Sequence, residues 1–182
     1  LGGGVSKANP ATRAFGYYQP EPGNPNSPAG ENITALAFDA SRRSLWIGTR
    51  GNGLDRMDLI TGEFVHYRHD PEDENSLDDD HITLLHIGPR GDLFVETQAG
   101  VLEIYDPAVD GFLPALSNLV GYRSRFPTTA ITHDVEGMLW LSQTSGQLLR
   151  VDRARDMIIR YELRAYAPDP IQGFEVTDIH AD

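Results

Sequence analysis

The sequence contains no cysteine, no long apolar segment and no excess of positive charge. Without cysteine, neither a disulfide framework nor a cysteine-ligated zinc site can form, and both oxidising and reducing compartments remain compatible with the composition. No stretch approaches about 18 consecutive apolar residues, so we expect no membrane insertion by this segment. Acidic residues outnumber basic ones by 27 to 15, for a net charge of −12, which disfavours nucleic acid as a partner.

Helical periodicity is also missing from the sequence. No window shows a sustained apolar period of about 3.6 residues. The 12 prolines and 18 glycines would interrupt most helices. The chain has 182 residues, 40% of them hydrophobic, which is enough material for a core. These features predict an all-β globular domain.

One unit of about 47 residues is used repeatedly along the chain. Its register is set by three pairs of a leucine and an aromatic residue: Leu45-Trp46, Leu93-Phe94 and Leu139-Trp140. Four glycines recur at nearly the same spacing: Gly4, Gly53, Gly100 and Gly146. Because the chain begins and ends within a unit, we expect its first and last repeats to be incomplete.

Each unit contains four short apolar runs separated by turn-forming residues, the pattern of consecutive antiparallel strands. In the second unit the runs are Ile82 to Ile87, Leu93 to Thr97, Val101 to Tyr105 and Phe112 to Leu116. Repeats of roughly 40 to 50 residues with four strands each are typical of β-propeller blades. The sequence therefore predicts a β-propeller of four-stranded blades, with about four blades represented in an incomplete ring.

The repeat also predicts the domain organisation, a single propeller segment over residues 1–182. Residues 1–31 are the end of one blade and its connecting loop. Three blades follow at residues 32–81, 82–127 and 128–174, and residues 175–182 begin the next blade.

The first complete unit resembles a known family, the two-component regulator propeller repeat. The residues that carry the resemblance are Leu45 to Thr49, Gly51 to Asp58, Thr61 to Phe64, His69 to Pro71 and Asn75 to Leu77. The end of the unit recurs upstream at Pro25-Asn26-Ser27. Later units match more loosely, since Glu96 and Ser142 stand at the Gly48 position and the loops 117–127 and 164–174 lack the Asp-Pro and Asn-Ser pattern.

This resemblance implies the ligand-sensing, extracytoplasmic input module of a bacterial membrane receptor. The module would be periplasmic and non-catalytic, with a histidine kinase or diguanylate cyclase output outside this chain. The expected partner is a small molecule or an oligosaccharide, without a cofactor, and the parent receptor would form a homodimer. Two alternatives stay open: a secreted propeller enzyme such as a lyase, and a scaffold for protein association.

Three groups of residues suggest sites but have simpler explanations. The acidic run Asp70 to Asp80 could surround a hard cation, but a solvated loop between blades explains it equally well. The repeated aromatic position of Trp46 is explained by packing between blades. Three histidines recur at intervals of 47 residues: His86, His133 and His180. The strand register places His133 on the opposite face from His86, so we expect no metal site.

A ligand site in a propeller is expected at the mouth of its channel, where the loops leading into the innermost strands converge. Three residues start those strands: Asn32, His81 and Glu175. A neighbouring variable loop contributes three more: Tyr122, Arg123 and Arg125. Position in the repeat, rather than any catalytic motif, selects these residues as ligand-binding candidates. We expect no catalytic residue and no metal ligand.

Overall fold

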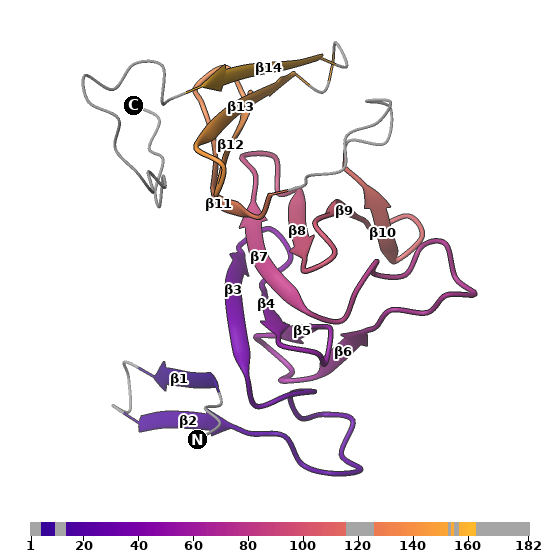
Figure 1. Cartoon of the computed structure of the whole chain (residues 1–182). Helices are drawn as coiled ribbons and strands as arrows, with labels where there is room; N and C mark the ends of the chain where they lie inside the picture. Colours follow the sequence, from indigo (N-terminus) through magenta and orange to yellow (C-terminus); the bar gives the residue numbers. More distant parts are fainter. Residues whose placement is uncertain (1–4, 10–13, 116–125, 153, 155–156, 163–182) are drawn as a thin grey trace.

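The computed structural model describes residues 5–9, 14–115, 126–152, 154 and 157–162, and within these ranges the regular elements are all β-strands. One two-stranded and three four-stranded sheets succeed one another along the chain, each antiparallel with its strands in sequence order (Figure 1). Within the described ranges, no helix is long and apolar enough to cross a membrane.

The strands have the following bounds: β1 Val5–Asn9, β2 Ala14–Tyr18, β3 Ile33–Asp39, β4 Ser44–Thr49, β5 Leu54–Asp58, β6 Phe64–Tyr67, β7 Ile82–Ile87, β8 Leu93–Thr97, β9 Leu102–Asp106, β10 Gly111–Pro114, β11 Thr128–His133, β12 Leu139–Gln143, β13 Gln147–Asp152 and β14 Met157–Glu162. We call β3–β6 the first sheet, β7–β10 the second and β11–β14 the third. In the second sheet, β7 and β8 have the predicted bounds, while β9 begins one residue later than predicted.

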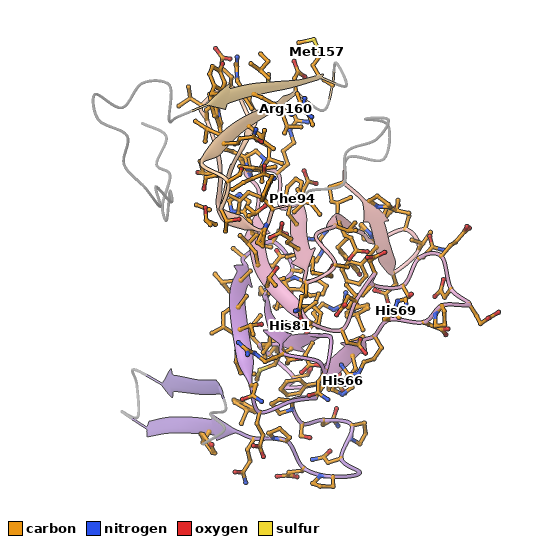
Figure 2. The ribbon with its side chains drawn as sticks, viewed as in Figure 1. His66, His69, His81, Phe94, Met157 and Arg160 are labelled. Atoms are coloured by element: carbon orange, nitrogen blue, oxygen red, sulfur yellow. The ribbon has the colours of Figure 1, made fainter. Side chains whose placement is uncertain are left out.

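The sheets pack face to face, with the first strands β3, β7 and β11 closest together along one side of the stack (Figure 1). A cluster including Trp46, Tyr67 and Phe112 fills the space between the first and second sheets. Phe94 belongs to the cluster between the second and third sheets and lies at their junction in Figure 2. Both faces of the second sheet are therefore covered, as propeller packing requires.

The repeated aromatic position behaves as predicted in the first two sheets. Trp46 and Phe94 are fully buried, whereas Trp140 is only partly buried. Trp140 lies on the face of the third sheet away from the second, where its ring stacks on Tyr161 and its Nε1 donates to Asp134 Oδ2. This aromatic residue is therefore packed and hydrogen-bonded within its own sheet.

Close approach between sheets explains why the Gly48 position changes along the chain. A Cβ on Gly48 would lie 2.7 Å from Ile82 Cγ2, at the start of the second sheet. In the second sheet the same position holds Glu96, which is buried and accepts the backbone N–H of Thr128 at 3.1 Å. This position therefore faces the first strand of the next sheet. A glycine stands opposite the Ile82 side chain, and a glutamate stands where the Thr128 N–H needs an acceptor.

Buried carboxylates fasten the loops that lead into the first two sheets. Asp55 on β5 is fully buried and accepts the backbone N–H of Ala29 at 2.7 Å. Glu103, at the same position on β9, accepts the N–H of Asp78 at 3.2 Å. Burial raises the pKa of Glu103 to about 7, although the Asp78 N–H opposes the rise. On β13 the position holds Leu149, and the loop before that sheet lacks the Asn-Ser pattern.

The two fastened loops have the same pattern of internal hydrogen bonds. Ser27 Oγ accepts the N–H of Glu21 at 2.9 Å, and Ser76 Oγ accepts the N–H of Asp70 at the same distance. The acidic run Asp70 to Asp80 thus forms an ordered connection between β6 and β7, in which every residue from Asp70 to Glu74 is exposed.

We predict that Asp55→Ala destabilises the fold through the loop that Asp55 holds. The change leaves the Ala29 N–H and the His66 ring, which lies 2.7 Å from Asp55 Oδ1, without their shared acceptor. An unsatisfied buried donor costs about 1–3 kcal/mol. Urea unfolding of the full chain measures the loss, and Glu72→Ala in the exposed part of the acidic loop is the control. Equal stability of the two variants would show that the carboxylate does not fasten the loop.

Candidate functional site

The sheets present two ends with different connections. At one end, which we call the rim, the loops lead into β3, β7 and β11 and turns join the second and third strands of each sheet. At the other end, the turn end, turns join the first strand to the second and the third to the fourth. Two of the predicted ligand-binding residues, Asn32 and His81, belong to the rim.

The structure brings two predicted rim residues close to one another. Asn32 accepts the backbone N–H of Arg50 at 2.9 Å, and Arg50 also forms an isolated β-bridge with His81. The carbonyl of His81 in turn accepts the N–H of Gln98 at 2.8 Å. Arg50 is exposed between the two candidates, so it joins Asn32 and His81 as a rim residue that the sequence had not indicated.

The other predicted rim residues lie outside the described residues: Glu175, Tyr122, Arg123 and Arg125. Ligand binding at the rim therefore stays a prediction.

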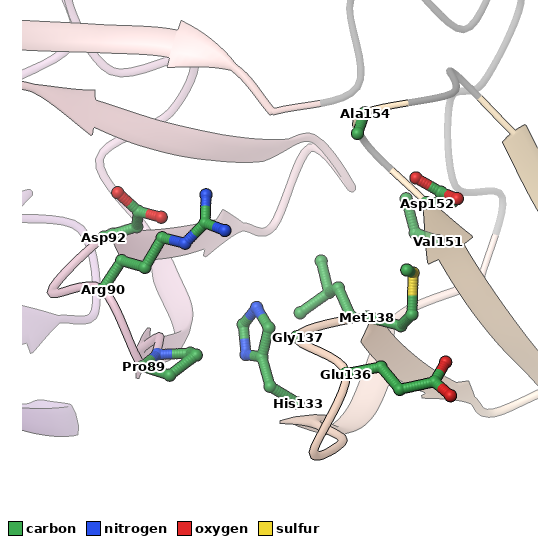
Figure 3. Close-up of a pocket in the computed structure, with 11 residues that line it drawn as sticks. Pro89, Arg90, Asp92, His133, Glu136, Gly137, Met138, Val151, Asp152 and Ala154 are labelled. Carbon is green, nitrogen blue, oxygen red and sulfur yellow. The ribbon is translucent and has the colours of Figure 1, made fainter.

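A pocket of about 170 Å³ lies at the turn end, between the second and third sheets (Figure 3). Its lining residues are Pro89, Arg90, Asp92, His133, Glu136, Gly137, Met138, Leu139, Val151, Asp152 and Ala154. Figure 3 shows Arg90 and Asp92 on the second-sheet side, facing Glu136 and Met138 of the third sheet across His133. The pocket thus combines charges of both signs with apolar side chains, which suits recognition of a polar molecule.

A histidine pair connects the two sheets beside this pocket. His86 Nε2 and His133 Nδ1 are 3.0 Å apart, and their rings are stacked with centroids 5.1 Å apart. Burial, reinforced by the neighbouring His133, lowers the pKa of His86 to about 4. At neutral pH His86 is therefore uncharged, and one ring nitrogen of the pair can donate to the other.

Lying on opposite faces of their sheets does not keep these histidines apart. The register itself holds, because His86 pairs with Phe94 whereas Thr132, not His133, pairs with Trp140. However, neighbouring sheets face one another. A side chain on the forward face of β7 therefore meets one on the backward face of β11, and alternation brings the two rings together.

Among the described residues, no group of three or more histidine or acidic side chains could hold a metal ion. His180 lies outside the described residues.

Sequence reasoning missed the pocket at the turn end because its walls come from different repeats. Arg90 and Glu136 each follow the first strand of their own sheet, in stretches that look like ordinary tight turns. The one available signal was that charged residues stand in both turns. Only the face-to-face stacking of sheets shows that these turns border a common space.

Consecutive four-stranded antiparallel sheets, stacked around a shared inner side, define the class of this protein as a β-propeller segment, and its described residues do not close into a ring. No protein-family model and no curated protein matches the sequence. Solved structures do match it, and they share this fold.

The extracellular domain of BT3049 of B. thetaiotaomicron, assigned to a hybrid two component system, matches with a TM-score of 0.69 and 22% identity over 82% of this chain and 21% of that one. The extracellular domain of BT4673 from the same organism matches with a TM-score of 0.61 and 18% identity, over 87% and 22% of the two chains. The β-propeller domain of Cps50 (Swd1) from Myceliophteria thermophila matches with a TM-score of 0.50 and 18% identity, over 71% and 41%. The chain spans about a fifth of the length of the first two structures.

The histidine pair predicts a pH dependence of stability. Because folding lowers the pKa of His86 from 6.5 to about 4, protonation favours the unfolded chain. The free energy of unfolding is therefore highest above about pH 6.5 and decreases as the pH falls toward 4. We expect the melting temperature of the wild type to fall over this range more steeply than that of His86→Leu.

Calorimetry across this pH range measures the difference, and His81→Asn at the rim serves as a matched control that should keep the wild-type profile. If His86→Leu lost stability with pH as steeply as the wild type, the pair would not be the titrating element.

Proposed function

We propose that this propeller segment is the ligand-sensing input module of a bacterial membrane signalling receptor. The observation that carries the proposal is the likeness of its sheets to the extracellular domains of BT3049 and BT4673, together with the repeat motif of the first sheet. In this role the segment lies outside the cytoplasm, in the periplasm, and recognises a small molecule or an oligosaccharide without catalysis. A kinase or cyclase output and a homodimer interface would belong to the parent receptor.

The described surfaces support recognition more than turnover. The pocket between the second and third sheets mixes Arg90, Glu136 and apolar side chains, and the His86 ring beside it is engaged with His133. At the rim, exposed Arg50 stands between Asn32 and His81 and offers a donor to a polar ligand. Both arrangements thus present charged and polar groups to a ligand.

Thermal unfolding of the full chain with a library of oligosaccharides and small polar metabolites tests this function. A molecule that binds only the folded state raises the melting temperature. We expect at least one such molecule, whose effect is lost in Arg50→Ala if it binds at the rim and in Arg90→Ala if it binds in the pocket between the second and third sheets. Arg160→Ala, on the exposed outer strand β14 (Figure 2), is the control and should leave the effect unchanged.

Absence of any stabilising molecule, or chemical conversion of the molecule that binds, would contradict the sensor function and favour the scaffold or the enzyme respectively. The reading frame around the segment gives an independent test, since a sensor requires a membrane anchor and a kinase or cyclase in the same protein.

A further inference from the structure

A second pocket lies on the first sheet, at its turn end and near the second sheet. It has a volume of about 290 Å³, near the lower limit of roughly 300–1,000 Å³ typical of small-molecule sites. Its lining residues are Arg42, Ser44, Arg56, Asp58, Glu63 and Val65. Five of these six side chains are polar or charged, so an apolar ligand does not fit this pocket.

One wall of the pocket is made of two arginine side chains, each of which uses only part of its hydrogen-bond donors within the protein. Arg56 donates from Nη1 to the hydroxyl of Tyr105 at 2.7 Å, and Arg42 donates from Nη1 to Asp39 and to the carbonyl of Gly91. The Nε and Nη2 atoms of both arginines donate to no residue that the structure describes. Each guanidinium therefore keeps one edge available for a ligand.

Ser44 adds an unpartnered hydroxyl to the same wall. Its residue is only 3% exposed, and Oγ has no hydrogen-bond partner among the described residues. Leaving a buried polar atom without a partner is unfavourable, because the atom has lost its hydrogen bonds to water. A ligand acceptor in the pocket would satisfy it.

Aromatic rings hold Arg56 in place before any ligand arrives. Its guanidinium carbon lies 5.5 Å from the ring centre of Trp46, 5.7 Å from that of Tyr67 and 5.8 Å from that of Tyr105. Contacts of this kind fix the orientation of a guanidinium and lower the entropy lost when it binds a carboxylate.

The other wall consists of acceptors. Asp58 Oδ1 accepts the backbone N–H groups of Ile60 and Thr61, and Glu63 Oε2 accepts the hydroxyl of Thr61. These bonds leave Asp58 Oδ2 and Glu63 Oε1 for another donor. The N–H groups of Thr61 and Ile60 also hold the pKa of Asp58 below its usual range, so this carboxylate is charged at neutral pH.

We propose that this pocket binds a small zwitterion, in the simplest case a free α-amino acid. The ligand's carboxylate accepts hydrogen bonds from Arg42, Arg56 and Ser44 Oγ, and its ammonium group donates to Asp58 and Glu63. Neither a simple anion nor a simple cation satisfies both walls, because one wall repels it. A neutral polyol meets both walls with weaker bonds, since hydrogen bonds between charged partners are about twice as strong as neutral ones.

The corresponding place in the third sheet has different residues and different contacts. There Met138 replaces Ser44, and the counterpart of Arg56 is Arg150, whose Nη2 donates to Glu136 at 2.8 Å while its Nε lies 3.8 Å from Asp134. In the first sheet the equivalent aspartate, Asp39, is paired with Arg42 instead.

Isothermal titration of the full chain with each standard L-α-amino acid tests the proposal. We expect at least one amino acid to bind, and its amide and N-acetyl derivatives to bind at least tenfold more weakly, because each derivative removes one charged end. Ser44→Ala and Glu63→Gln should each weaken binding by roughly tenfold, or about 1.4 kcal/mol. The matched control, Glu72→Gln in the exposed part of the loop between β6 and β7, should bind like the wild type.

Ser44→Ala removes a buried hydroxyl that has no partner, and Glu63 is exposed, so neither change removes a contact on which folding depends. The proposal is overturned if no amino acid binds, if both derivatives bind as well as the parent amino acid, or if both variants bind normally. None of these results decides the sensor function, which is tested at Arg50 and Arg90 with other ligands.

Discussion

Every four-stranded sheet in this chain has two faces to cover, and face-to-face stacking is how the fold covers them. The space between the first two sheets shows what this requires: Trp46 and Tyr67 from one sheet pack against Tyr105 and Phe112 from the next. Asp110 accepts both tyrosine hydroxyls and keeps them satisfied at the border of the cluster. The positions of the loops, the histidine pair and both pockets follow from this stacking, because each lies where two sheets meet or diverge.

Polar contacts hold the loops that connect the sheets, whereas apolar packing holds the sheets themselves together. A fully buried carboxylate such as Asp55 is costly to desolvate, and burial raises its pKa although the Ala29 N–H and the His66 ring oppose the rise. The chain retains this arrangement in two sheets with loops of matching pattern and replaces it with Leu149 where the loop pattern changes. Carboxylate and loop therefore behave as one unit within the repeat.

Much of the fold could be predicted from the sequence, because strands and turns are properties of one repeat. The runs at Ile82 and Leu93 gave strand bounds that the structure confirms, and tight turns followed the glycines. The contacts between repeats could not be predicted in the same way. Alternation along β11 assigned His133 to the correct face, but only the stacking of sheets shows that this face meets His86. The rim candidates Asn32 and His81 were placed together, whereas both pockets at the turn end were missed.

The two pockets share a property that links the fold to function. Ser44, Asp92 and Met138 stand at one position of the repeat, each directly before a leucine of the second strand. That leucine is the same in all three sheets because it packs between sheets, whereas the residue before it varies among a hydroxyl, a carboxylate and a thioether. All three variable residues line a pocket. Packing thus fixes the leucine, while the residue before it can vary and change the lining of the pocket beside it. A propeller of similar blades can therefore carry different sites.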